Sequence, residues 1–406
     1  MHVVFVEPSF PGNQVEFVRG LAEVGATVTG IGELPAEALP DGIKRYLNDY
    51  EHVGSVCHEE EMLATVRRIQ GRGWVDRLEA TVEAHILPVA HVREACKIPG
   101  TSVRTAFLCR DKPAMKQALR EAGVSCARSA GVSSPEETRA FAERVGYPII
   151  LKPRSSAGAA GTYRVDNDDD LEAAIRECGI DRGAATAAEE FIEGHEAFYD
   201  TLTIDGRIAH EFISHYYPGV LEALRTRWIS PYFLTTNRVE AESYDEVRAM
   251  GKRVIEVLGI ETSATHMEWF FGPKGLKFSE IGCRPPGVGA WDLYTAANDM
   301  DLYREWASAI AHGRTASKPS RQYSTGIINL RPDRDGTITG YGGLDELHAR
   351  FGSNILDSHL PPPGTPTQPV EAGYMANAWI RMRHTDYDEL RQMLDAVGQT
   401  VKVFAR

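Results

Sequence analysis

The sequence predicts a protein of mixed α/β and α+β class, with an N-terminal α/β domain, two central portions and a β-rich C-terminal portion. Three patterns indicate this class. A strand–helix–strand pattern occupies residues 2–32, two strands around a loop of small residues occupy 147–165, and two strand-like runs joined by a turn occupy 264–282. We expect the following four domains: 1–104, 105–185, 186–315 and 316–406.

Composition and charge exclude several classes of partner. Apolar residues make up 43% of the chain and charged residues 25%, which is ordinary for a globular protein. The formal net charge is −13 and no polybasic run is present, so we expect neither a nucleic acid nor an anionic membrane as partner. No apolar run approaches the roughly 20 residues that span a bilayer.

The cysteines and the first residues indicate a compartment. The six cysteines show neither a CxxC motif nor zinc-like spacing, and the opening MHVVFVEPSF lacks the pattern of a signal peptide. We therefore expect a reduced, cytoplasmic protein. A homodimer is left open.

The N-terminal domain should be an open α/β sheet. Residues 2–7 and 26–32 have the pattern of strands, and helical patterns occupy residues 15–25, 59–71 and 77–98. Gly12 follows the first strand, but no G-x-G-x-x-G is present, so this glycine indicates a turn and not a dinucleotide site.

The second portion contains a candidate phosphate site. A helix begins after Asp111, which suits its N-cap, and Pro113 suits its first turn. The strand YPIILK ends in Lys152, and the loop after it carries Gly158 and Gly161 among serines and alanines. Small residues let a phosphate approach backbone N–H groups. The loop is not a Walker A motif, and loops of this composition also join strands that bind nothing.

A β-hairpin is predicted in residues 264–282. Residues 273–275, Pro-Lys-Gly, suit a three-residue loop that contains a type I turn with the glycine in the left-handed conformation. This loop sets the register and places Phe270 opposite Phe278.

The same register places Glu268 opposite Glu280 on one face of the hairpin. Two like charges in this position are destabilising unless a cation lies between them. A register slip of one residue would instead turn both glutamates to solvent. Together with two lysines and a small-residue loop, the pair indicates a magnesium–nucleotide site, because Mg²⁺ takes one or two carboxylates and completes its shell with phosphate and water.

In combination, the motifs RDKPAM, ILKP, EEFIEGHEAF and FSEIGCRPPG resemble those of the ATP-grasp superfamily, carboxylate–amine ligase type. This group includes the L-amino acid ligases, D-alanine–D-alanine ligase and the biotin carboxylase core. The resemblance covers about residues 105–315. It implies the ATP-grasp fold, with an N-terminal Rossmann-like (pre-ATP-grasp) domain, a central lid subdomain, a nucleotide-binding portion and a C-terminal closing domain. It also implies ATP and Mg²⁺ as cofactors, with Mn²⁺ as an alternative metal.

The resemblance assigns residues to the nucleotide. Lys112 and Lys152 match the two phosphate-binding lysines, and residues 155–162 match the flap over the β- and γ-phosphates. The hinge at residues 190–192 would meet the adenine edge, and Glu196 would hold the ribose hydroxyls. An exposed, charged strand end is the alternative interpretation of EEFIEGHE. The nucleotide-contacting residues implied are Lys112, Lys152, Ser155, Ser156, Gly158, Gly161, Glu189, Glu190, Phe191, Ile192 and Glu196.

The resemblance also assigns the metal ligands and a catalytic residue. Glu268 and Glu280 match the two magnesium-binding glutamates, and Arg284 matches the arginine over the reacting carboxylate. Gly282 departs from the family, which often has an asparagine ligand there, and this departure leaves the number of metal ions open. We expect Cys283 to be a small buried residue and not a nucleophile.

The implied reaction joins a small-molecule carboxylate to a small-molecule amine through an acyl phosphate. Two alternatives stay open, namely a carboxylase-like enzyme that acts on bicarbonate and an ATP-binding module without catalytic activity.

The substrates are not specified by the motifs. His215, Arg225 and Arg227 could meet an acidic substrate, or they could face solvent and pair with nearby acids. Glu83 and His85 could point into the cleft between the first domain and the core.

Overall fold

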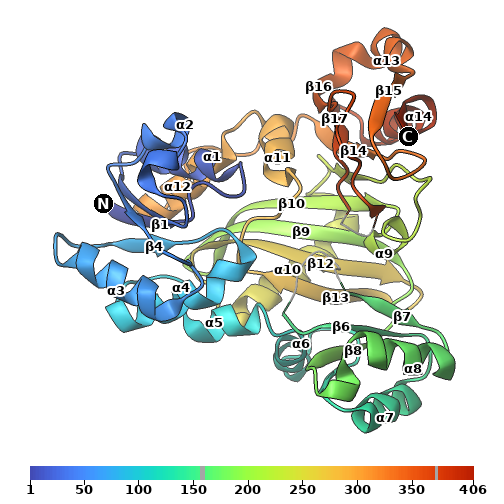
Figure 1. Ribbon diagram of the computed structural model, residues 1–406, viewed down its shortest axis with the longest axis horizontal. Coiled ribbons are helices and arrows are strands. Elements are labelled where there is room, and N and C mark those ends of the chain that lie inside the picture. The colour runs from blue at the N-terminus through green and yellow to red at the C-terminus, as the bar shows by residue number, and fades with distance from the viewer. Residues whose placement is uncertain (156–160, 371–373) are drawn as a thin grey trace.

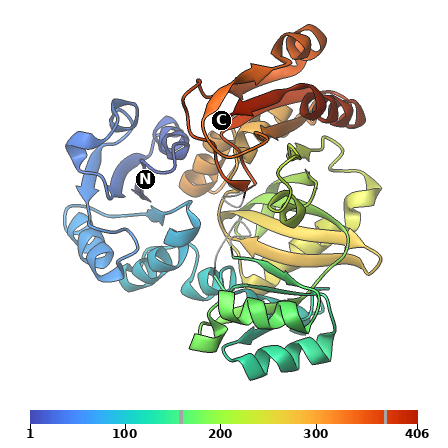
Figure 2. The same cartoon turned by 45° about the vertical axis from the view of Figure 1, so that its right-hand side comes forward.

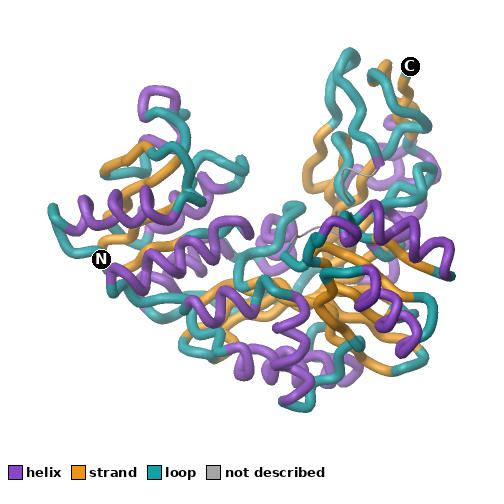
Figure 3. The backbone as a smooth tube through the Cα atoms, turned by 60° about the horizontal axis from the view of Figure 1, so that its bottom comes forward, coloured by secondary structure: helices purple, strands orange, loops and turns teal. Residues whose placement is uncertain are grey.

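A computed structural model describes residues 1–155, 161–370 and 374–406. Figure 1 shows an N-terminal block, a small block from α6 to β8 (residues 112–190) that we call the lid, a central sheet and a C-terminal block. Figure 2 shows the N-terminal, lid and C-terminal blocks arranged around the central sheet, and Figure 3 shows the two ends of the chain on separate blocks. Within the described ranges, we find no helix of the length and apolarity that crossing a bilayer requires.

The N-terminal block is a parallel α/β sheet with the strand order β3-β2-β1-β4. Residues 3–6 of β1 are fully buried, as is typical of a strand covered by helices on both faces. Arg77–Glu79 forms a strand where we expected a helix, because it pairs in parallel with β1. The elements are β1 (His2–Val6), α1 (Gln14–Glu23), β2 (Thr27–Gly32), η1 (Ala36–Ala38), α2 (Asp41–Lys44), β3 (Asp49–His52), α3 (Glu59–Gln70), β4 (Arg77–Glu79), η2 (Glu83–His85), α4 (Ile86–Cys96) and α5 (Val103–Leu108).

The lid is a four-stranded sheet of order β5-β8-β6-β7 with helices packed against it. Its first helix is capped as predicted, since the Asp111 carboxylate accepts a hydrogen bond from the backbone N–H of Ala114 at 3.0 Å. Strand β8 pairs with β5 and β6, so the lid sheet continues past residue 185. The elements are α6 (Lys112–Glu121), β5 (Ser129–Val132), α7 (Pro135–Val145), β6 (Ile149–Pro153), β7 (Tyr163–Val165), α8 (Asp168–Glu177), η3 (Ile180–Arg182) and β8 (Thr186–Glu190).

The central sheet has eight strands in the order β13-β12-β9-β10-β11-β14-β17-β16. Three of these strands, β14, β16 and β17, come from the C-terminal portion, so that portion continues the central sheet. The central elements are β9 (His195–Ile204), β10 (Arg207–Tyr217), α9 (Val220–Ala223), β11 (Tyr232–Thr235), η4 (Glu242–Tyr244), α10 (Asp245–Leu258), β12 (Ser263–Gly272), β13 (Gly275–Gly282), α11 (Ala290–Asn298) and α12 (Leu302–His312).

The C-terminal portion adds a two-stranded sheet of β15 and β18 and a helix near the end of the chain. Helix α14 packs its buried leucines against β14 and β17. The elements are β14 (Ser324–Leu330), β15 (Ile338–Gly342), α13 (Leu344–Phe351), η5 (Gly352–Asn354), β16 (Ile355–His359), β17 (Ala378–His384), α14 (Tyr387–Thr400) and β18 (Lys402–Ala405).

The predicted hairpin is β12–β13, but its register differs from the prediction in one part. Gly272 pairs with Gly275, so the loop has two residues and not three. Phe270 therefore lies opposite Lys277, and the predicted pairing with Phe278 is wrong. A register shift between Glu268 and Trp269 then leaves one extra residue on β13, as in a β-bulge.

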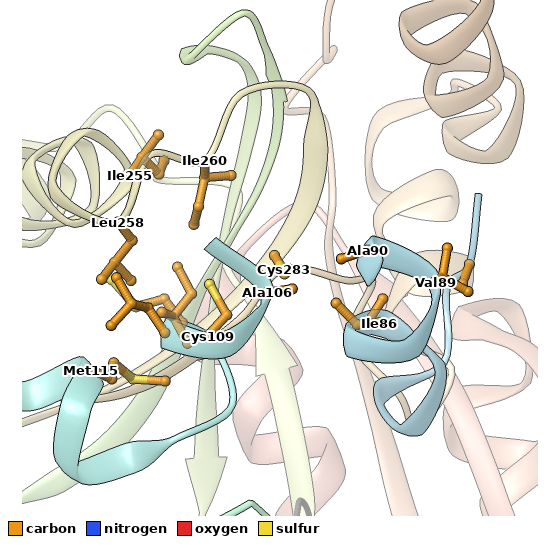
Figure 4. Packing of buried hydrophobic residues seen from close by; sticks show 14 of the residues in the cluster. Ile86, Val89, Ala90, Ala106, Cys109, Met115, Ile255, Leu258, Ile260 and Cys283 are labelled. Atoms are coloured by element: carbon orange, nitrogen blue, oxygen red, sulfur yellow. The ribbon is translucent and has the colours of Figure 1, made fainter. Parts of the chain in front are cut away.

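One apolar cluster joins the N-terminal block to the central portion. Figure 4 shows Ile86, Val89 and Ala90 of α4 and side chains of α5, α6 and α10 around Cys283. Cys283 is buried in this cluster, as expected. Because Cys283 packs in this cluster, the backbone next to Arg284 is held against both the N-terminal block and the central portion.

Candidate active site

A cleft of about 1660 Å³ lies where the four blocks meet. Its walls include the loop before α1, the lid strand β6, the hinge after β8, the hairpin β12–β13 and residues of the C-terminal portion. Residues of every predicted site group line it, and the groups form three regions: an apolar end, a charged centre and a third end around Arg284.

The charged centre is built on the hairpin. Glu268 lies directly opposite Glu280, as predicted, and both side chains are partly exposed to the cleft. His266 lies two residues before Glu268 on the same face, and its Nε2 is 3.6 Å from Glu268 Oε1. Its Nδ1 is 2.7 Å from Asp200 Oδ1 on the neighbouring strand β9. Burial lowers the pKa of His266, but Asp200 more than offsets this effect and raises it to about 9.

Both predicted lysines reach this pair. Lys112 Nζ is 3.4 Å from Glu280 Oε2, and Lys152 Nζ is 3.6 Å from the same oxygen. Burial alone would raise the pKa of Glu280, but the two ammonium groups lower it below its usual value. The carboxylate is therefore ionised at neutral pH and lies between two cations.

A third lysine, Lys116, lies beside them and was not predicted. It is one helical turn after Lys112 on α6, its side chain is only 1% exposed, and its Nζ is 2.6 Å from Glu189 Oε2. Lys152 Nζ is 2.9 Å from the same oxygen. Burial would raise the pKa of Glu189, but the two lysines hold it at about 2. The spacing of the two lysines on α6 was the available sequence signal.

Glu196 is a third carboxylate near the centre. It lies on β9 on the same face as Glu268, and the backbone N–H of Val220 donates a hydrogen bond of 2.6 Å to its Oε2. Burial, followed by the nearby charge of Glu268 and Glu280, raises the pKa of Glu196 to about 8. In the absence of a cation the carboxyl group is therefore largely protonated at neutral pH.

The predicted hinge lies at the apolar end. Phe191 and Ile192 line the cleft with Ile150 of β6, and Arg164 stacks over the Phe191 ring at 4.4 Å. The Glu190 carboxylate accepts hydrogen bonds from Lys274 and Arg128, so its side chain ties the hinge to the hairpin turn and to the lid. The contact of this hinge with adenine stays a prediction.

The predicted flap is described only at its edges. Ser155 is exposed, and its carbonyl oxygen accepts a hydrogen bond from Arg110 at 3.1 Å. Gly161 is also exposed, with φ of +69°. Ser156 and Gly158 lie outside the described residues.

Arg284 lies at the third end of the cleft, where it is held by the N-terminal block. Its Nε donates to Glu83 Oε2 at 2.8 Å and its Nη1 donates to the carbonyl of Pro285 at 2.9 Å. Arg110 also donates to Glu83. A Cβ atom on Gly282 would lie 3.1 Å from Glu83 Oε2. Glu83 therefore occupies the space that a side chain at position 282 would need.

The other substrate candidates separate in the structure. Arg225 lines the cleft, whereas Arg227 pairs with Asp335 at 2.6 Å. His215 is buried and bonded to His195 and Tyr244, away from the cleft wall. His85 is buried and is not a lining residue, unlike Glu83.

The centre fits a magnesium ion by its donor set. Glu268 and Glu280 provide two facing carboxylates, and the described residues contain no cluster of three or more His, Cys, Asp or Glu side chains that could hold an ion alone. Magnesium commonly binds one or two carboxylates and otherwise phosphate and water. The neighbouring lysines suit the phosphates of a nucleotide, since Lys112 and Lys152 both lie within 4 Å of Glu280.

Comparisons with known proteins agree with this geometry. Residues 117–299 match the model of the ATP-grasp domain. Alanine–anticapsin ligase of Bacillus subtilis is 26% identical over 247 residues, which are 55% of this chain and 52% of the relative. The chain thus spans about half the length of that relative. The L-arginine-specific L-amino acid ligase of Bacillus subtilis is 27% identical over 295 residues, covering 71% of this chain and 70% of the relative.

Solved structures extend the likeness to the whole chain. The L-amino acid ligase from Bacillus licheniformis superposes with a TM-score of 0.77 at 17% identity and covers 100% of this chain and 98% of its own. N5-carboxyaminoimidazole ribonucleotide synthetase from Thermotoga maritima superposes with a TM-score of 0.70 at 16% identity, covering 100% and 99%. Residues 117–299 therefore match an ATP-grasp domain, and the chain as a whole has the ATP-grasp fold.

Proposed function

We propose that this chain is an ATP-dependent ligase that activates a small-molecule carboxylate as an acyl phosphate and couples it to a small-molecule amine, with release of ADP and phosphate. The observation that carries the proposal is the meeting of Glu268, Glu280, Lys112, Lys152 and Arg284 in one cleft. The named relatives, an alanine–anticapsin ligase and an L-arginine-specific L-amino acid ligase, support the same reaction class.

Different residues of the chain bind different parts of the nucleotide. Lys112 and Lys152 hold the phosphates, and the apolar hinge at residues 191–192 receives the base. When bound to Glu268 and Glu280, magnesium supplies charge neutralisation at the transferring phosphate. Phosphoryl transfer mainly requires this positioning and neutralisation, and no protein nucleophile.

Arg284 serves the second half of the reaction. Its guanidinium is fixed by Glu83 and by the carbonyl of Pro285, so the remaining N–H groups are held in place toward the cleft. Fixed donors of this kind stabilise the oxyanion that develops when an amine attacks an acyl phosphate. Two consecutive prolines, Pro285 and Pro286, limit backbone movement beside the arginine.

The test is ADP release from Mg-ATP in the presence of panels of carboxylates and amines, with mass spectrometry of the products. We expect release that depends on both substrates and an amide product. ATP binding with no ADP release for any pair would favour a non-catalytic binding module. Release with bicarbonate alone would favour the carboxylase-like alternative.

A further inference from the structure

The charged centre contains a continuous chain of ion pairs. Lys116 and Lys152 share Glu189 Oε2, at 2.6 and 2.9 Å, and Lys152 and Lys112 share Glu280 Oε2, at 3.6 and 3.4 Å. These five side chains line the cleft. We name them the lysine–glutamate chain.

Lys116 is the least exposed member of the lysine–glutamate chain. At 1% exposure its ammonium group has lost nearly all contact with solvent, and burial of an ion is costly unless a partner offsets the loss. A methionine or leucine on the same face of α6 would fill the space without this cost. The charge itself therefore requires an explanation beyond packing.

The net charge of the lysine–glutamate chain provides this explanation. Three lysines and two glutamates give 3 − 2 = +1, a net positive charge at the point where phosphates are expected. Without Lys116 the count is 2 − 2 = 0. Lys152 would then be the only lysine paired with Glu189. The second oxygen of this carboxylate, Oε1, has no hydrogen-bond partner among the described residues, so no other group there would draw Glu189 away from Lys152.

We propose that Lys116 is a positioning residue for nucleotide binding. It neutralises Glu189, so that Lys152 stays available to the phosphates and the lysine–glutamate chain stays net positive. This inference rests on the proposed function in one respect, because the phosphates are taken to be those of ATP.

The experiment compares the binding of ATP, ADP and adenosine by calorimetry in the full chain with magnesium, with thermal unfolding measured alongside. For Lys116→Met we expect ATP and ADP affinity to fall about 10- to 100-fold, the size expected when a nearby unit charge is removed at intermediate dielectric. Adenosine affinity should change by less than about threefold, because adenosine carries no phosphate. Lys252→Met, an exposed lysine on α10 outside the cleft, is the matched control and should leave all three affinities unchanged.

The double variant K116M/E189Q tests the charge count directly. The double variant has two lysines and one glutamate, so the net charge of the lysine–glutamate chain is again 2 − 1 = +1. The ratio of ADP affinity to adenosine affinity, which falls in K116M, should therefore return most of the way to the wild-type value. The single variant Glu189→Gln raises the count to 3 − 1 = +2 and should increase this ratio above that of the wild type. This last measurement decides the matter if K116M does not fold.

The outcomes separate this inference from the proposed function. A wild type that binds neither ATP nor ADP overturns the proposed function. A wild type that binds both, together with a folded K116M that binds them equally well, overturns the role of Lys116 alone. A parallel loss of adenosine and ADP affinity in K116M, with no recovery in the double variant, would show a purely structural role and would also overturn it.

Discussion

Arg284→Lys tests the part of the mechanism that distinguishes an enzyme from a nucleotide-binding module. A guanidinium has five N–H donors, of which Arg284 uses one for Glu83 and one for the carbonyl of Pro285, so three remain for the cleft. A lysine at this position keeps the charge but has a single nitrogen. That nitrogen cannot hold Glu83 and also present a planar pair of donors to the reacting group.

The expected magnitude follows from this loss of donors. Removing an oxyanion donor typically lowers kcat by about 10²–10³, equivalent to about 2.7–4 kcal/mol of transition-state stabilisation. Because no ion pair between Arg284 and the lysine–glutamate chain is formed in the described structure, Mg-ATP affinity should change by less than about threefold.

Two measurements check the prediction, namely ADP release with the substrate pair that supports the wild type and calorimetric binding of Mg-ATP. Arg110→Lys is the matched control, because Arg110 contacts the other side of Glu83 and does not line the cleft. We expect it to lose no more than about tenfold in kcat. A drop in ATP affinity as large as the drop in rate would refute the assignment, and so would full activity of the lysine variant.

Three further changes address the metal site, the space beside the arginine and the hinge. Glu280→Gln should abolish ADP formation while the fold stays intact, and normal turnover in this variant would contradict the metal assignment. Gly282→Ala places a Cβ atom 3.1 Å from Glu83 Oε2 and should lower kcat about three- to tenfold without changing ATP affinity; an equal loss of ATP affinity would point to a wider distortion. Burial would raise the pKa of Glu190, but hydrogen bonds from Lys274 and Arg128 lower it to about 2, below its unfolded value. The stability that this carboxylate contributes is therefore present above about pH 4.5 and lost toward pH 2. Glu190→Gln should therefore lower the free energy of unfolding by about 1–2 kcal/mol at pH 7, after allowance for the exposed lysine. Urea denaturation should show that this difference decreases as the pH falls. A difference that does not depend on pH would contradict the ion pair.

The hairpin shows how a site can be predicted when its local geometry is not. The loop was predicted one residue too long, which would have shifted the register by one position. An extra residue on β13, at the bulge between the loop and Glu280, shifts the register back by the same amount. Glu268 therefore faces Glu280 as predicted, while Phe270 faces Lys277. Turn residues restrict loop length, but a bulge inserts one residue that the strand pattern alone does not indicate.

Residues that depend on long-range pairing could not be predicted. His266 meets Asp200 only because β12 pairs with β9, two strands that are far apart in the sequence. Lys116 is different, since its spacing from Lys112 placed both side chains on one face of a helix whose start was predicted. What the sequence did not indicate is that this face is buried against Glu189 and not exposed to water, which requires the position of the lid sheet.

The electrostatics of the cleft explain why its parts come from separate blocks. Glu196, Glu268 and Glu280 lie on three adjacent strands, β9, β12 and β13, and burial, followed by the charge of Glu268 and Glu280, raises the pKa of Glu196 to about 8. The cations that face them come mainly from the lid, through Lys112 and Lys152. Neither the lid nor the central sheet neutralises its own charges in the cleft. The charges of each are neutralised by those of the other and by a bound metal–phosphate group. A nucleotide whose phosphates bind the lid lysines while its metal binds the hairpin carboxylates would join the two blocks across the cleft, and the same electrostatic contacts that bind it would hold the lid against the central sheet.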